Sequence, residues 1–120
     1  MRVVVAGSRD GVSEKLVRDT IVDILKKHPG VTVVTGGARG VDTIAHIHAK
    51  SLGATTEVYP ADWTRYGNSA GFVRNELMVN LPDVVLVVCI YPGYRTSGTS
   101  HTASLARRKN IEVTEVGLGD

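Results

Sequence analysis

Three apolar segments of this chain each end in glycine and are followed by a stretch whose apolar residues recur at helical spacing. The glycines are Gly7 in AGSRDG, the pair Gly36 and Gly37 in TGGARG, and Gly98 in SGTS. Strand, glycine turn and helix form the repeating unit of a parallel α/β sheet. All strand-to-helix turns of such a sheet lie at one edge, so we expect these three turns to converge.

The pattern of apolar residues predicts five strands, over residues 2–6, 31–35, 54–59, 84–90 and 111–116. Four helical stretches alternate with these strands. This alternation implies right-handed crossovers, with helices on both faces of the sheet. We therefore predict an α/β fold, a Rossmann-like three-layer sandwich with a five-stranded, mainly parallel sheet.

Individual segments allow finer predictions. The run 84–90 is the most hydrophobic and is expected to be the central strand, whereas the polar residues of 54–59 suggest a place near an edge. Ser13 is the expected N-cap of the first helix. Residues 60–69 are expected to form a long loop. The expected apolar face of the helix that follows consists of Val73, Leu77 and Leu81.

Composition indicates one domain over residues 1–120, with 42% hydrophobic and 22% charged residues. No apolar run approaches the roughly 20 residues of a membrane-spanning helix, so no membrane association is expected. The single cysteine, Cys89, ends an apolar run and is expected to be a buried thiol in a cytoplasmic protein. A net charge of +2 does not by itself indicate nucleic-acid binding.

The glycine turns are candidate sites for an anionic ligand, because backbone N–H groups at such turns and at helix N-termini bind phosphate. Arg39 would add a bidentate fork. Asp42, in the first turn of the second helix, would either accept hydrogen bonds from ribose hydroxyl groups or only interact favourably with the helix dipole. The candidate ligand- or phosphate-binding residues in these turns are Gly7, Ser8, Arg9, Gly36, Gly37, Arg39, Asp42, Gly98, Thr99 and Ser100.

Neither G-x-G-x-x-G after the first strand nor G-x-x-x-x-G-K-[ST] occurs in the sequence. A conventional NAD-binding domain and a P-loop NTPase are therefore disfavoured, and no cofactor is expected.

His46 and His48, two residues apart on a helix, face different directions and cannot jointly bind a metal, so no metal site is expected. Trp63 and Tyr66 could stack on a base or could pin their loop to the domain.

Four segments carry a resemblance to a known family: VVTGGARGVDTIAH, YPADWTRYGNSAGFVRNELMV, PDVVLVV and SGTSHTASLARRKNIEV. They resemble the YspA-like branch of the SLOG superfamily, which includes the Lonely Guy phosphoribohydrolases and the DprA/Smf proteins. The resemblance covers nearly the whole chain. It implies a Rossmann-like fold that binds nucleotides or nucleotide-derived ligands, and homo-oligomer formation.

Comparison with the Lonely Guy pattern adds Arg74 as a candidate for both ligand binding and catalysis, because it stands where those enzymes have an arginine. Gly98 and Thr99 match the G-T of their P-G-G-x-G-T-x-x-E motif. The glutamate of that motif is replaced by Thr102, which lacks the carboxylate that N-glycosidic cleavage requires. Three other carboxylates are expected near the turns and could substitute, namely Asp10, Asp42 and Asp62.

The function expected first is binding of a nucleotide-like small molecule at the carboxyl ends of the strands, as a sensor or as an enzyme of unknown chemistry. One alternative is an N-glycoside hydrolase acting on nucleoside 5′-monophosphates. Another is a DprA-like module that binds single-stranded DNA. This last alternative is less favoured, because the charge is modest and the chain has only one Trp, one Phe and four Tyr.

Overall fold

A computed structural model describes residues 1–119. Eleven elements follow one another along the chain, in the order β1 (Arg2–Gly7), α1 (Glu14–Lys27), β2 (Thr32–Thr35), α2 (Val41–Ser51), β3 (Thr55–Val58), α3 (Trp63–Tyr66), the 3-10 turn η1 (Gly67–Ser69), α4 (Ala70–Val79), β4 (Val84–Gly93), α5 (Ser97–Arg108) and β5 (Glu112–Leu118). The five strands form one sheet in the order β3-β2-β1-β4-β5, and every neighbouring pair is parallel. The predicted α/β, Rossmann-like fold is thus confirmed.

The predicted centre of the sheet is wrong, because β1 and not β4 is the middle strand. β3 lies at one edge, as its polar residues suggested. β4 is the most hydrophobic strand because it lies between β1 and β5 and has both of its faces covered. Val88 packs into the core on one face of the sheet and Val87 into the core on the other.

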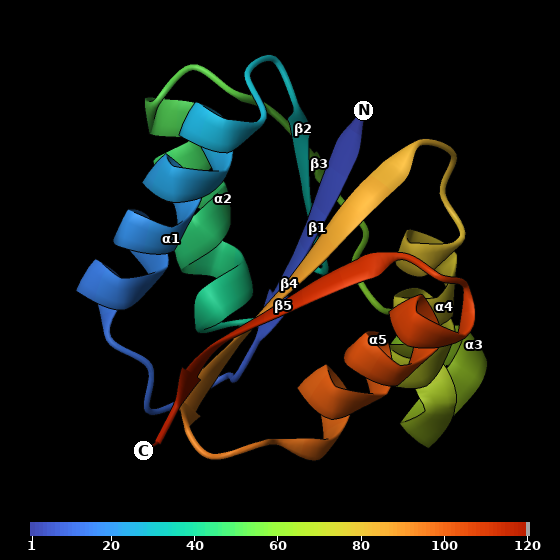
Figure 1. The fold of residues 1–120 in the computed structure, drawn as a ribbon. Coiled ribbons are helices and arrows are strands. Elements are labelled where there is room, and N and C mark those ends of the chain that lie inside the picture. The colour runs from blue at the N-terminus through green and yellow to red at the C-terminus, as the bar shows by residue number, and fades with distance from the viewer. Residues whose placement is uncertain (120) are drawn as a thin grey trace.

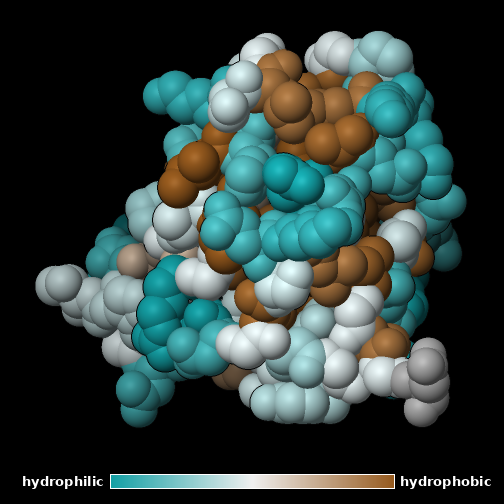
Figure 2. Space-filling model, turned by 90° about the vertical axis from the view of Figure 1, so that its left-hand side faces the viewer, coloured by the Kyte–Doolittle hydropathy of each residue, from teal (hydrophilic) through white to brown (hydrophobic). Residues whose placement is uncertain are grey.

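Helices cover both faces of the sheet and give the molecule its three layers (Figure 1). α1 and α2 pack on one face and bury Val17, Ile21 and Ala45. α4 and α5 pack on the other, where Met78 and Ala103 are buried. The outer face of the α1 and α2 layer is largely hydrophilic, with smaller hydrophobic patches between the polar side chains (Figure 2).

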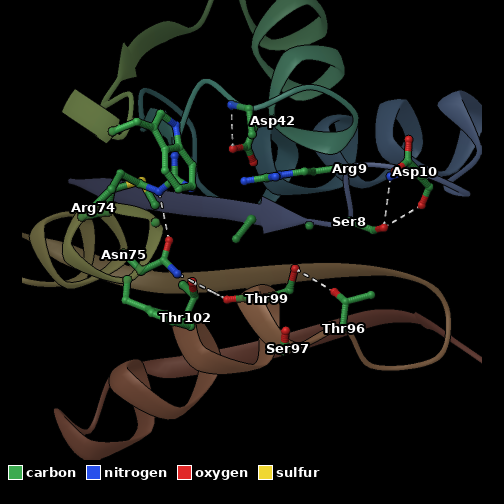
Figure 3. Close-up of a pocket in the computed structure, with 18 of the residues that line it drawn as sticks. Ser8, Arg9, Asp10, Asp42, Arg74, Asn75, Thr96, Ser97, Thr99 and Thr102 are labelled. Atoms are coloured by element: carbon green, nitrogen blue, oxygen red, sulfur yellow. Dashed lines mark hydrogen bonds between the residues drawn. The ribbon is translucent and has the colours of Figure 1, made fainter. Parts of the chain in front are cut away.

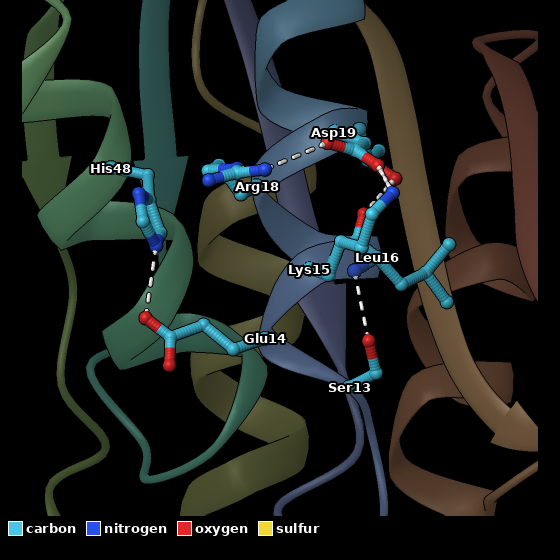
Figure 4. Close-up of polar contacts among 8 residues, drawn as sticks. Ser13, Glu14, Lys15, Leu16, Arg18, Asp19 and His48 are labelled. Carbon is cyan, nitrogen blue, oxygen red and sulfur yellow. Dashed lines mark hydrogen bonds and ion pairs between the residues drawn. The ribbon is translucent and has the colours of Figure 1, made fainter.

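Local contacts fix the first helix where the sequence predicted it. The Ser13 hydroxyl accepts a hydrogen bond from the Leu16 N–H at 3.0 Å, which caps α1 (Figure 4). Glu14, in the first turn, lies 3.2 Å from His48 Nε2 and links α1 to α2.

No helix in the described part of the chain has both the length and the apolar character that a membrane span needs. Cys89 is buried, and burial raises the pKa of its thiol to about 12.

Residues 60–69 do not form the long loop that was predicted from their composition. They contain the single-turn helix α3 and the turn η1. Asp62 starts α3 by accepting a hydrogen bond from the Arg65 N–H at 3.0 Å. This compact segment leads directly into α4 and places Trp63 beside the carboxyl ends of the strands.

The buried face of α4 also differs from the prediction. Leu77 is 48% exposed, whereas Asn75 and Met78 are buried. The buried face of α4 is thus rotated away from Leu77, while Val73 is half-buried and Leu81, beyond the end of the helix, packs against the core as predicted. This rotation directs Arg74 and Asn75 toward the turns of the sheet.

Candidate functional site

The strand-to-helix turns converge, as predicted, around a cleft of about 400 Å³, which we call the main cleft (Figure 3). The turn after β1, the start of α2, the helix α4 and the start of α5 all contribute to its walls. Seven of the predicted site residues line it: Gly7, Ser8, Arg9, Asp42, Arg74, Gly98 and Thr99. The cleft thus lies outside the carboxyl ends of the strands, where open α/β sheets bind their ligands.

A second hollow of about 430 Å³, the side cavity, adjoins the main cleft. The two share Arg9, Ala38, Trp63 and Arg74, which form the junction between them. The predicted residues Gly36, Gly37 and Arg39 line the side cavity and not the main cleft. Ser100 lines neither of these two hollows, although it lies in the first turn of α5, and its side chain is close to that of Tyr91.

Arg74 is held between two elements by its own hydrogen bonds. Nη1 donates to the carbonyl oxygen of Gly36 at the end of β2, and Nε donates to Asn75 Oδ1 at 3.0 Å. A Cβ on residue 36 would overlap the guanidinium, so glycine is required for this close approach. Partial burial lowers the pKa of Arg74, although the nearby Asp42 carboxylate opposes that effect. The result is a positioned cation at the junction of the two hollows.

Asn75 is a site residue that the sequence reasoning missed. Its side chain is buried, and Nδ2 donates to the carbonyl oxygen of Gly98 at 3.3 Å. Because Oδ1 accepts from Arg74, this one amide connects the arginine to the first turn of α5. Taking Ala70, Met78 and Val79 as the apolar face of α4 would have placed residues 74 and 75 on its inner side.

Asp42 combines burial with a position in the wall of the main cleft. Its side chain is 6% exposed, and Oδ2 accepts a hydrogen bond from the Ala38 N–H at 3.2 Å. Burial raises the pKa of this carboxyl to about 6, although the guanidinium groups of Arg74 and Arg9 act in the opposite direction. In Figure 3 its carboxylate lies on the same side of the cleft as these two guanidinium groups.

The turns after β1 and β2 are interlocked. The Val41 N–H donates to the Ser8 carbonyl at 3.1 Å, and Arg39 Nη2 lies 2.9 Å from Asp10 Oδ2. Gly40 lies between them at φ 81° and ψ −130°, a conformation that is essentially restricted to glycine. A Cβ at this position would come within 2.4 Å of the Arg9 carbonyl oxygen. The backbone of one turn therefore packs directly on the other.

Gly40→Ala is expected to lower the free energy of unfolding by roughly 3 kcal/mol, because it adds a backbone clash to an unfavourable φ. Gly53→Ala is the matched control. Its φ of 85° is similar, but a Cβ there meets no atom within 4 Å. The control should cost only about 1 kcal/mol. Urea denaturation measures both values, and equal losses would show that the contact between the turns contributes nothing.

The start of α5 forms the opposite wall of the main cleft. Thr96 and Thr99 are joined through their hydroxyl groups at 3.2 Å. Thr102, at the position of the Lonely Guy glutamate, is buried and lies 3.4 Å from the Gly98 carbonyl oxygen. The dipole of this twelve-residue helix favours negative charge at Ser97 and Gly98. This wall suits an anionic or hydroxyl-bearing group.

Aromatic side chains border the cleft on the side of α3 and α4. Trp63 and Phe72 both line the cleft and are 51% and 49% exposed. The Arg9 guanidinium lies 5.8 Å from the Trp63 ring centroid, within the range of a cation–π contact. Phe72 packs edge-on against His101 with centroids 4.6 Å apart. Buried Met78 completes an apolar wall that faces the polar start of α5.

Comparison with known proteins places this arrangement in context. The model of the YspA, cpYpsA-related SLOG family matches residues 1–66, which contain the first two turns. The chain is also similar to the Gene 61 protein of Mycobacterium phage D29. The two are 37% identical over an alignment of 123 positions, which covers 97% of this chain and 96% of the phage protein.

Proposed function

The chain belongs to the YspA, cpYpsA-related SLOG family, and from this premise and the cleft geometry we propose that it binds a nucleotide or a nucleotide-derived ligand. Membership of this family suggests a nucleotide-related ligand. The observation that carries the proposal for this chain is the pairing, in one cleft, of an apolar aromatic wall with the positioned guanidinium of Arg74.

The size and polarity of the main cleft match such a ligand. A hollow of about 400 Å³ lies within the range of sites for small molecules. Trp63, Phe72 and Met78 provide a surface on which a base would stack. A phosphate would be bound by Arg74 and by the N-terminus of α5, where the helix dipole and backbone N–H groups favour an anion. Asp42 would accept hydrogen bonds from ribose hydroxyls between these two regions.

The sole tryptophan gives a direct assay, because Trp63 lies in the wall of the cleft. Titration with nucleoside 5′-monophosphates, ADP-ribose and NAD-like compounds should change its fluorescence and raise the melting temperature. A ligand at 100 times its Kd adds about 2.7 kcal/mol, which amounts to roughly 10 °C for a chain of this size. Adenosine and inorganic phosphate are the controls, since each lacks half of the ligand. Failure of every phosphorylated nucleoside to bind the folded protein would reject the proposal.

A second candidate function is hydrolysis of the N-glycosidic bond of a nucleoside 5′-monophosphate. The specific observation in its favour is Asp42, since only this one of the three candidate carboxylates is buried in the cleft wall with a pKa of about 6. Asp10 is exposed and paired with Arg39, and Asp62 caps α3. A carboxyl with such a pKa is able to exchange a proton near neutral pH. Chromatography of the same nucleotides after incubation with the protein tests this function. The wild type should release free base, and Asp42→Asn should release none.

A further inference from the structure

We infer that the preferred ligand has two parts joined by a diphosphate, with a nucleoside in the main cleft and a second sugar-like group in the side cavity. This inference rests on the nucleotide-binding function proposed above and specifies its ligand class. It starts from the presence of two adjoining hollows of similar size, about 400 and 430 Å³. Each lies near the lower end of the range for a small-molecule site. A mononucleotide in the main cleft would leave the second hollow unused.

The junction between the hollows has the right charge for a diphosphate. Arg9 and Arg74 line both hollows. Arg74 is fixed by its bonds to Gly36 and Asn75 through Nη1 and Nε, which leaves Nη2 without a hydrogen-bond partner within residues 1–119. Arg9 is exposed and makes its contact with the Trp63 ring. Two guanidinium groups at one junction match two linked phosphates, because each can bind phosphate oxygens with a bidentate fork.

The charges that line the two hollows also differ. The main cleft is lined by two carboxylates, of which Asp10 is paired with Arg39 and Asp42 lies near Arg74 and Arg9. The side cavity is lined by Arg9, Arg39 and Arg74, with no carboxylate among its lining residues in the described chain. The more anionic part of a ligand is therefore favoured on the side-cavity side of the junction. This orientation places the nucleoside in the main cleft, beside its aromatic wall and Asp42.

The rest of the side-cavity lining leaves room for more than phosphate. Gly36, Gly37, Pro60 and Ala61 are small or compact residues there. Gly37 is exposed at φ 72°, and a Cβ at this position would come within 2.9 Å of Val58. Glycine thus keeps the backbone open to a ligand where any side chain would be strained. A hollow of this size, bordered by backbone groups and an arginine, suits a hydroxylated sugar ring.

The test compares each nucleoside monophosphate with its diphosphate-linked sugar, by calorimetry on the whole chain: AMP with ADP-ribose, UMP with UDP-glucose and GMP with GDP-mannose. For the base that binds best, the two-part ligand should bind about tenfold more tightly or better. The simple nucleoside diphosphate should lie between the two. If the monophosphate binds but the two-part ligand is no tighter, the inference is overturned and the proposed nucleotide-binding function stands. If no phosphorylated nucleoside binds, both are overturned.

Two substitutions, each adding a bulky side chain to one of the two hollows, test where each part of the ligand binds. Ala61 lines the side cavity alone, so Ala61→Phe should remove the advantage of the two-part ligand and leave monophosphate affinity within about twofold. Gly71 lines the main cleft alone, and a Cβ there meets only Trp63, at 3.8 Å. Gly71→Leu should therefore weaken both ligands. A preference for the two-part ligand that survives in a folded Ala61→Phe protein would overturn the inference, and melting curves establish that each variant is folded.

Discussion

Asp42→Asn is expected to stabilise the protein by about 3 kcal/mol above pH 7 and to have little effect near pH 4. Burial raises the pKa of this carboxyl from 3.8 to about 6. The folded state therefore holds the proton more tightly than the unfolded state. The favourable contribution of the protonated group is complete below pH 3.8 and is lost as the pH rises through 6. Asparagine keeps an oxygen for the Ala38 N–H and removes the buried charge.

Urea denaturation from pH 4 to pH 8 measures this difference directly. The stability of the wild type should fall relative to that of Asp42→Asn between about pH 4 and pH 6 and then run parallel to it. Asp10→Asn is the control with the opposite sign, because the Arg39 guanidinium lowers the pKa of the exposed Asp10 carboxyl. Its contribution is present above the unfolded-state pKa of 3.8 and is lost only below it, so from pH 4 to pH 8 the Asp10→Asn curve should run nearly parallel to that of the wild type. Parallel curves for wild type and Asp42→Asn over the whole range would contradict the burial argument.

A carboxylate that destabilises its own fold at neutral pH needs another explanation for its presence. The Asp42 carboxyl accepts a hydrogen bond from the Ala38 N–H, with the Gly36 backbone also close to it, and has no ion pair within 4 Å among residues 1–119. Its position in the cleft wall beside Arg74 is consistent with a role in ligand binding, where burial strengthens hydrogen bonds to hydroxyl groups. The stability gained in Asp42→Asn should therefore be accompanied by weaker binding of ribose-containing ligands.

The fold could be predicted from the sequence because runs rich in apolar and β-branched residues alternate with stretches of helical periodicity. Gly7 and Gly36 mark the ends of β1 and β2, whereas Gly98 lies in the first turn of α5, after β4 has ended at Gly93. Parallel connectivity required the turns that follow these strands to meet at one edge. The convergence of the turns needed no knowledge of side-chain packing. It follows from the direction of the strands alone, which explains why this part of the site was predictable.

Predictions failed where a helix buries polar groups. Helical periodicity assigns the apolar residues of a helix to its inner face, and this rule pointed to Val73 and Leu77 in α4. The inner face of α4 includes Asn75, whose amide is satisfied by Arg74 and the Gly98 carbonyl. These partners come from the same helix and from α5, so the cost of burying the amide is offset only in the folded structure. The division of the turns between two hollows likewise depends on side chains, chiefly Arg74.

Arg74→Ala is expected to weaken nucleotide binding by about 100-fold or more, the largest effect on binding that we predict for a single residue. Charge-assisted hydrogen bonds are worth about 1.5–3 kcal/mol each, and a bidentate contact to phosphate would lose two of them. Arg74→Lys keeps the charge but loses the planar fork and the Nε contact to Asn75. It should recover only part of the affinity, with a loss of about tenfold.

Titration of Trp63 fluorescence with the best-binding nucleotide measures these losses, and Arg18→Ala is the control, because Arg18 is exposed on α1 and lines neither hollow. Asn75→Ala tests the positioning of the Arg74 guanidinium separately from its charge. It keeps the guanidinium but removes the hydrogen bond that Nε donates to Asn75, so binding should weaken less than in Arg74→Ala. If a folded Arg74→Ala protein bound the nucleotide with wild-type affinity, the phosphate would not bind at the junction of the two hollows. The N-terminus of α5 would then remain as its site.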